Sequence, residues 1–330
     1  MAKSKRKEAQ PAQPEQPAHK ADPERAARIF ILSGVGAMLL LVVGLLIGGW
    51  YWTQIRPLDK TVLQVGEIKF SLGHLERRMS DELSLIPASS LSNEFLLALP
   101  DTVLRAFERE AKVLEAAGDL DVTVSDLEID EEIAQRGNIA AGAGPSAFAA
   151  ELKRQVDDSG LKLDEFLQMI KAELLESKVL AHFTDAAADR EPQVRARWIV
   201  ISVDDLEAAE ELFARLEAGE EFAAMVEDLP DSAASTEEDW VPRGLFPDQA
   251  IEDFLFEAQE GQYSEVISTL IGHFIVELQE RDEDRELDEV QKDRIGTREL
   301  FIWLGSLDAI IEIEQNITDE DRIRALDDIF

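Results

Sequence analysis

Side chains that could do acid–base or covalent chemistry match no catalytic motif in this sequence. The chain has no cysteine, which excludes thiolate catalysis, disulfides and zinc sites built on sulfur. No HExxH, GxSxG, Walker or dinucleotide-binding pattern occurs, so we expect no cofactor and no catalytic metal. The four histidines are scattered along the chain: His19, His74, His182 and His273.

The segment from Val194 to Leu278 has the clearest order of elements. Arg197 to Ser202 is an apolar, β-branched run that predicts a buried strand. Amphipathic spacing predicts three helices, over Asp204 to Leu216, Phe222 to Leu229 and Gln249 to Phe256. Two more strands are expected around Val266 to Thr269 and Phe274 to Leu278.

Short motifs accompany this order of elements. They are Gly219-Glu-Glu-Phe222, Arg243-Gly244, Phe256-x-Ala258-x-x-Gly261-x-x-Ser264 and Ser264-x-Val266-Ile267-x-Thr269-x-Ile271-Gly272. Order and motifs together resemble the parvulin (PpiC-type) family of peptidyl-prolyl isomerases. The resemblance implies an α/β domain with a four-stranded, antiparallel-type sheet. It also implies isomerisation at X–Pro bonds, which needs no nucleophile, because the barrier of about 18–20 kcal/mol comes from amide resonance.

The resemblance also implies which residues face the reacting proline. Trp198 and Phe274 occupy the two positions where the family usually carries histidine, and Asp231 lies near the family's Asp or Cys. Asp231 and Thr269 are the implied catalytic residues. The implied substrate-binding residues are Trp198, Phe246, Ile251, Thr269 and Phe274.

The sequence departs from the family pattern on the catalytic side. The family's GGDLGW turn reads Ser235-Thr-Glu-Glu-Asp239-Trp240, without the glycines. His273 stands one position before the expected histidine, so on a strand it should face away from Phe274. We therefore expect an isomerase fold whose catalysis is weak or absent; the alternative is a non-catalytic holdase or an envelope assembly scaffold.

A mostly helical region is predicted over residues 57–187. Thr61 to Phe70 should form two short strands, and Ser71 should cap a helix to about Leu83. Further helices are expected over 93–100, 101–118, 125–135, 145–156 and 164–183, with Pro100 stopping the first of them and Ser125 to Glu128 forming a capping box. This order resembles the N-terminal chaperone region of SurA-, PrsA- and PpiD-type extracytoplasmic foldases.

Helices return after the isomerase-like segment. Residues 283–330 should contain helices over Val290 to Leu307 and Asp319 to about Ile329. Leu300, Trp303 and Leu304 form an apolar stripe at helical spacing. In the resembled foldases a C-terminal helix completes the N-terminal domain, which predicts that this stripe packs on the helical region; ordinary helix packing explains it equally well.

Residues 29–55 predict a transmembrane anchor. The stretch has no charged residue, is longer than the ~20 residues that cross a bilayer, and ends in Trp50, Tyr51 and Trp52. Residues 1–28 hold seven Lys/Arg against four acids and lack apolar periodicity. We expect residues 1–28 to be a disordered cytoplasmic tail, with the rest of the chain outside the membrane of a bacterial cell.

Charge narrows the choice of partners. The 330-residue chain has 69 acidic and 33 basic residues, a net charge of −36. Such a surface repels nucleic acid, which is excluded as a partner. The sequence thus predicts an α+β protein with one span, a helical domain over 57–187, a parvulin-like domain over 192–282 and C-terminal helices. Its expected partners are the lipid bilayer, through residues 29–55, and unfolded exported polypeptides.

Overall fold

The computed structural model describes residues 38, 42–45, 56–87, 91–140, 144–229, 234–235, 240–327 and 329. Contacts divide the chain into a first unit, Met1–Lys60, and a second, Thr61–Phe330. The predicted tail over 1–28 and nearly all of the predicted span over 29–55 lie outside the described residues. Within the described part of the chain, no helix is both long and apolar enough to cross a membrane. A short 3₁₀ helix, η2 (Arg56–Asp59), ends the first unit.

The second unit begins with a small antiparallel sheet. β1 (Thr61–Val65) and β2 (Ile68–Ser71) form a hairpin, as predicted, and β8 (Ile313–Gln315) pairs with the other edge of β1. Gly66, in the turn, donates its N–H to the carbonyl of Glu312 at 2.9 Å. The third strand was missed by the sequence analysis because three residues are too few to show a period of two.

Helices pack on this sheet and on one another. They are α2 (Leu72–Ser84), α3 (Asn93–Ala116), η4 (Ala117–Leu120), α4 (Asp126–Arg136), α5 (Pro145–Ser159) and α6 (Leu163–Ala186). The Ser71 hydroxyl caps α2 by accepting the N–H of His74 at 3.2 Å, and Ser125 with Glu128 forms the predicted capping box of α4.

The prediction of two helices separated at Pro100 was wrong. Pro100 lies inside α3, which is capped by Ser92 and continues to Ala116. Pro100 is itself buried, and its neighbours Leu99 and Val103 belong to the core around β1. Burial of this helix face offsets the cost of about 3 kcal/mol that a proline imposes inside a helix.

A second sheet is organised around two long strands, β3 (Arg190–Ile201) and β7 (His273–Glu286). β6 (Ile267–Ser268) pairs with β7, and two further short strands, β4 (Ala234–Ser235) and β5 (Val241–Pro242), both pair with β3. All these pairs are antiparallel, and the sheet has five strands where four were expected. Mixed helix and sheet confirm the α+β class.

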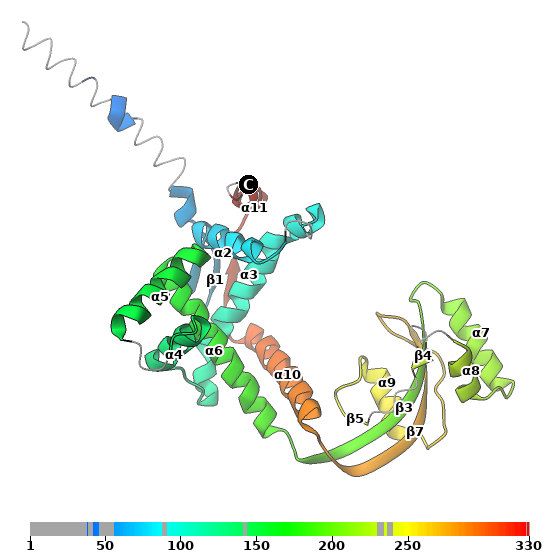
Figure 1. Cartoon of the computed structure of the whole chain (residues 1–330). Helices are drawn as coiled ribbons and strands as arrows, with labels where there is room; N and C mark the ends of the chain where they lie inside the picture. Colours follow the sequence, from blue (N-terminus) through cyan, green and yellow to red (C-terminus); the bar gives the residue numbers. More distant parts are fainter. Residues whose placement is uncertain are drawn as a thin grey trace, which may run out of the picture. The chain divides into compact units, whose positions relative to one another are not determined.

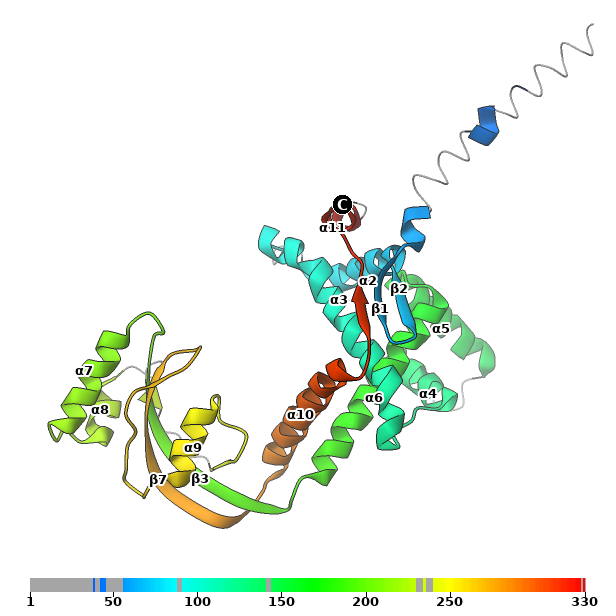
Figure 2. The same ribbon diagram turned by 180° about the vertical axis from the view of Figure 1, so that it is seen from behind.

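Helices cover both faces of this second sheet. α7 (Leu206–Glu217) and α8 (Phe222–Asp228) pack on one face, together with Ile199 and Ile275. α9 (Gln249–Glu257) packs on the other, together with Phe274 and Val276. Figures 1 and 2 show α9 and the α7–α8 pair on opposite sides of the β3–β7 ribbon.

The chain leaves the second sheet through α10 (Glu289–Ser306), which lies beside α6 (Figures 1 and 2). Leu300 and Leu304 of α10 are buried together with Leu175 and Val179 of α6. η5 (Leu307–Ala309), β8 and α11 (Asp319–Asp327) follow. Ala325 of α11 is buried in the core of the small sheet.

Candidate functional site

Trp198 and Phe274 lie on the same face of the second sheet. In the register of β3 and β7, Trp198 is opposite Val276 and Val200 is opposite Phe274. Positions two apart on a strand share a face, so both side chains point to the α9 side. Phe274 is 6% exposed, whereas Trp198 is only partly buried. Phe274 is therefore buried within this face of the sheet, and Trp198 is its partly exposed neighbour.

Two further expected residues join them from the segment around α9. Ile251 is 2% exposed and packs in the same apolar cluster, and Phe246 is partly buried against it. The rings of Phe246 and Phe256 meet edge to face, with centroids 6.3 Å apart. We call Trp198, Phe246, Ile251 and Phe274 the aromatic face. Trp198 and Phe246 are its partly exposed members, whereas Ile251 and Phe274 are buried.

Thr269 is held differently from the other expected site residues. It lies in the turn between β6 and β7, where its hydroxyl donates to the carbonyl of Gly272 at 2.9 Å and accepts the N–H of Ile271 at 3.2 Å. Both bonds stabilise the turn. The Thr269 hydroxyl is thus engaged in local structure, and Asp231, the other expected catalytic residue, lies outside the described residues.

His273 faces away from the aromatic face, as the sequence predicted. Its Nε2 lies 3.0 Å from the carbonyl oxygen of Val203, and its Nδ1 lies 2.9 Å from the hydroxyl of Ser268. Since a carbonyl can only accept, Nε2 donates to Val203, and both ring nitrogens are engaged in hydrogen bonds. His273 is 7% exposed, so this imidazole is a buried structural group.

A charged group beside the aromatic face was missed by the sequence analysis. The guanidinium of Arg243 lies over the ring of Phe256, 4.1 Å from its centroid, and 4.0 Å from the carboxylate of Glu252. Glu252 is 7% exposed and accepts the N–H of Gly244. The helical spacing of Glu252 and Phe256 on α9 was the available signal. This pair fixes the loop that carries Phe246.

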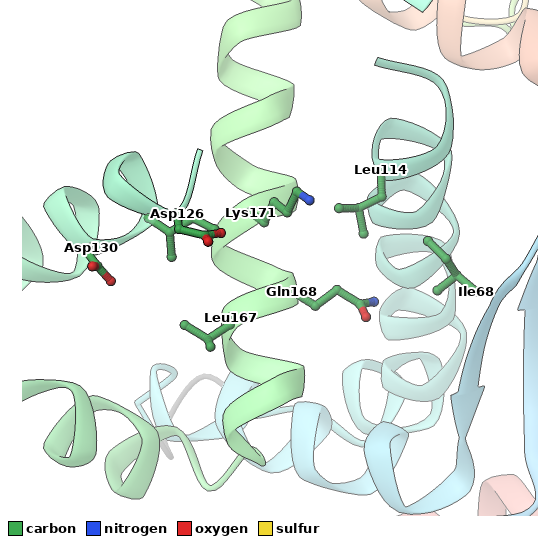
Figure 3. A pocket seen from close by; sticks show the side chains of 8 residues that line it. Ile68, Leu114, Asp126, Asp130, Leu167, Gln168 and Lys171 are labelled. Atoms are coloured by element: carbon green, nitrogen blue, oxygen red, sulfur yellow. The ribbon is translucent and has the colours of Figure 1, made fainter. Parts of the chain in front are cut away.

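The helical region contains a separate pocket of about 640 Å³. Its lining combines apolar and polar side chains: Ile68, Leu114, Asp126, Ile129, Asp130, Leu167, Gln168 and Lys171. Figure 3 shows Gln168 and Lys171 extending from α6 toward Leu114, while Asp126 and Asp130 come from α4. Among the described residues, no cluster of three or more His, Cys, Asp or Glu side chains could hold a metal ion.

Comparisons with known proteins relate the second sheet and its helices to one family. Residues 179–282 match the family described as the PPIC-type PPIASE domain. Foldase protein PrsA 3 of Bacillus cereus is 28% identical over 148 residues, which are 43% of this chain and 52% of that protein. The chain thus spans about half the length of the curated relatives it matches.

Solved structures resemble the chain at low identity. A peptidylprolyl isomerase (PrsA) from Bacillus anthracis aligns with 18% identity and a TM-score of 0.40, covering 69% of this chain and 95% of that one. A structure described among the SurA-like chaperones of Campylobacter jejuni aligns with 15% identity and a TM-score of 0.26, covering 77% of this chain and 98% of that one.

Proposed function

We propose that this chain, whose residues 179–282 form a PPIC-type PPIase domain, is a membrane-anchored folding factor for exported polypeptides. It binds proline-containing stretches of unfolded chain on the aromatic face. The observation that carries this proposal is the position of Trp198, Phe246, Ile251 and Phe274 on one side of the β3–β7 sheet, in a single apolar cluster. A proline ring packs there without any nucleophile, metal or cofactor.

Catalysis by this domain should be slow. Isomerisation is accelerated only by contacts that are stronger with the twisted imide than with the planar one. At the two positions where the resemblance implies histidine, the Trp198 indole offers a single N–H donor and Phe274 offers none. The aromatic face therefore retains the apolar contacts that bind both states alike and loses polar contacts that discriminate between them.

The membrane anchor is part of the same proposal and rests on the sequence of residues 29–55. An uncharged stretch of that length behind a basic tail favours a single span with the tail in the cytoplasm. Two relatives with similar sequences carry the name foldase, which agrees with a role in protein folding.

A second candidate function is that of a holdase without catalysis, in which the aromatic face only retains unfolded chain. The presence of Trp198 and Phe274 at the two positions where the family usually carries histidine favours this candidate. The 640 Å³ pocket of the helical region, with Ile68, Leu114 and Leu167 in its lining, supplies a further surface for apolar side chains.

Two assays on the full-length chain separate these functions. We expect prolyl isomerisation of a proline peptide only slightly above the uncatalysed rate, together with clear suppression of aggregation of an unfolded client. The double variant Trp198→His with Phe274→His should raise the isomerisation rate at least tenfold. The matched control is Phe254→His, which also places a histidine in this cluster but away from both positions.

The outcomes discriminate between the two candidates. Wild-type turnover far above background excludes the holdase. A double variant that binds the peptide but does not accelerate isomerisation supports the holdase. Failure of the wild-type chain both to bind a proline peptide and to suppress aggregation overturns both.

A further inference from the structure

A pocket of about 590 Å³ lies where the loop after β5 meets α10, and no residue of the aromatic face lines it. Its lining residues are Gly244, Leu245, Arg294, Thr297, Arg298, Phe301 and Ile302. The α10 members recur at spacings of three and four residues, so they form one stripe of the helix. At 1.5 Å per residue, the stripe from Arg294 to Ile302 is about 12 Å long.

The wall of this pocket is held in place by Arg298. Its Nη1 donates to the carbonyl of Arg243 at 3.1 Å, and its Nε donates to Glu299 at 3.2 Å. Gly244 has a φ of +79°, and a Cβ there would overlap the Arg298 guanidinium. The positive φ at this position favours glycine, and the hydrogen bond from Arg298 connects the two walls of the groove.

One end of the stripe is apolar and exposed. Phe301 and Ile302 are 55% and 57% exposed, and Leu245 is partly buried across from them. The guanidinium of Arg109 lies over the Phe301 ring, 5.3 Å from its centroid, which holds that ring in position. Adjacent exposed large apolar side chains that line a pocket indicate a binding surface.

The other end of the stripe is cationic. The Arg294 side chain is exposed and forms no hydrogen bond or ion pair within the described part of the chain. On α10, Glu299 is bound by Arg298, and Asp293, which precedes Arg294, is not among the residues that line the pocket; Arg109 is bound to Glu176. In a chain with 69 acidic and 33 basic residues, this rim is a local exception to the prevailing charge.

We propose that this groove docks an extended segment of a partner polypeptide that has an acidic side chain four residues away from a large apolar one. In an extended chain such residues share a face, and four residues span about 13 Å, which matches the length of the stripe. The apolar side chain packs on Phe301 and Ile302, and the carboxylate pairs with the exposed guanidinium of Arg294. No proline is required, so this site is independent of the aromatic face.

The test uses the full-length chain and two fluorescein-labelled peptides without proline. Phe-Leu-Ser-Gly-Glu-Glu should bind at least tenfold more tightly than Phe-Leu-Ser-Gly-Lys-Lys, by fluorescence anisotropy at low salt. Arg294→Glu should invert this preference. Ile302→Ser should weaken the binding of both peptides about tenfold and leave the preference for the acidic peptide unchanged. Trp198→Ala should leave the binding of the acidic peptide unchanged, so failure here is distinct from failure of the proposed function.

Lys69→Glu is the matched control, because Lys69 is an exposed cation on β2 and the change in charge is the same. The proposal is overturned if Arg294→Glu binds the acidic peptide as the wild type does, or if Lys69→Glu loses as much affinity. It is also overturned if Arg294→Glu changes only the oligomeric state, since the occupant would then be a second copy of this chain.

Discussion

The two aromatic residues that replace histidine differ in their surroundings, and this difference assigns them different roles. Phe274 is 6% exposed beneath α9 and lies opposite Val200 on β3 and Ile267 on β6. Trp198 is partly exposed and has the larger surface available to a ligand. Phe274 should contribute mainly to stability, and Trp198 mainly to binding.

Alanine substitutions should separate these roles. Phe274→Ala should lower the free energy of unfolding by about 3–5 kcal/mol, because it leaves a cavity in the core. Trp198→Ala should cost less stability and weaken binding of a proline peptide at least fivefold. Urea denaturation and anisotropy measure the two effects.

Phe213→Ala is the control for this pair, because Phe213 packs on the opposite face of the sheet. It should lower stability and leave peptide affinity unchanged. Equal loss of affinity in Trp198→Ala and Phe213→Ala would show that binding does not take place on the aromatic face.

Some residue positions followed from the sequence and others did not. The match of residues 179–282 confirms the parvulin resemblance. The facing of His273 was predictable because successive side chains on a strand alternate. The hydrogen bond from the Thr269 hydroxyl to Gly272 was not predictable, because a sequence motif does not give the hydrogen bonds within its turn.

At the scale of elements, the length of the β3–β7 ribbon exceeded the prediction. Apolar residues indicated only the central strand segments, and β7 continues into the charged run that ends at Glu286. Cross-strand ion pairs hold the strands together there, including Arg195 with Glu280 and Arg190 with Asp284. Exposed strands of this kind lack the apolar signal on which sequence reasoning depends.

The turn into β7 requires glycine. Gly272 has a φ of +157°, and a Cβ there would lie 2.7 Å from the carbonyl oxygen of Ile201. Gly272→Ala should therefore destabilise the fold by about 2–3 kcal/mol. Gly118→Ala is the control, because Gly118 has open space around it and should be neutral or slightly stabilising. Thermal unfolding measures both, and equal midpoints would contradict this account.

The contact between α2 and α3 contains a carboxyl group that should make stability depend on pH. Burial raises the pKa of Glu110 to about 7, against the opposing effect of Arg78, whose guanidinium donates to it at 3.0 Å. The nearby carboxylates of Glu173, Glu82 and Glu176 raise the pKa further. Because the folded chain retains this proton and the unfolded chain releases it, stability falls as pH rises from about 4.5 to about 7.

Glu110→Gln should remove this dependence. Relative to the wild type, the free energy of unfolding of the variant should increase by up to about 3 kcal/mol between pH 5 and pH 8. Urea denaturation at several pH values measures the difference. Burial also lowers the pKa of His74 to about 4, so stability falls as pH falls below about 6.5. This effect is the same in the wild type and in Glu110→Gln, so it cancels when the two proteins are compared. Parallel curves for the two proteins would refute the role of Glu110.

At the scale of the whole chain, the first sheet is completed by residues far away in sequence. β8 pairs with β1, and Asn316 donates its N–H to the carbonyl of Val62 at 2.8 Å. Arg322 of α11 pairs with Asp101 of α3 at 3.0 Å. The sequence predicted the helices of residues 283–330. It did not predict the pairing of β8 with β1, because pairing between distant segments leaves no local pattern in the sequence.

Asn316→Pro tests the importance of this pairing. Loss of the N–H that reaches Val62 should destabilise the small sheet by about 1–3 kcal/mol and speed hydrogen exchange at the Gly66 amide. Asn316→Ala is the matched control, because it keeps the N–H and should retain slow exchange. Identical exchange in both variants would show that β8 does not stabilise β1.

The pairing of β1 with β8 also sets the order in which the protein can fold during synthesis. A hairpin such as β1–β2 is marginal alone, and its third strand is translated only after the whole domain between β3 and β7. Folding of that domain places Arg190 opposite Glu286 and so shortens the loop that β8 must close. We therefore expect the inserted domain to fold first and to bring α10 to α6 before β8 pairs with β1.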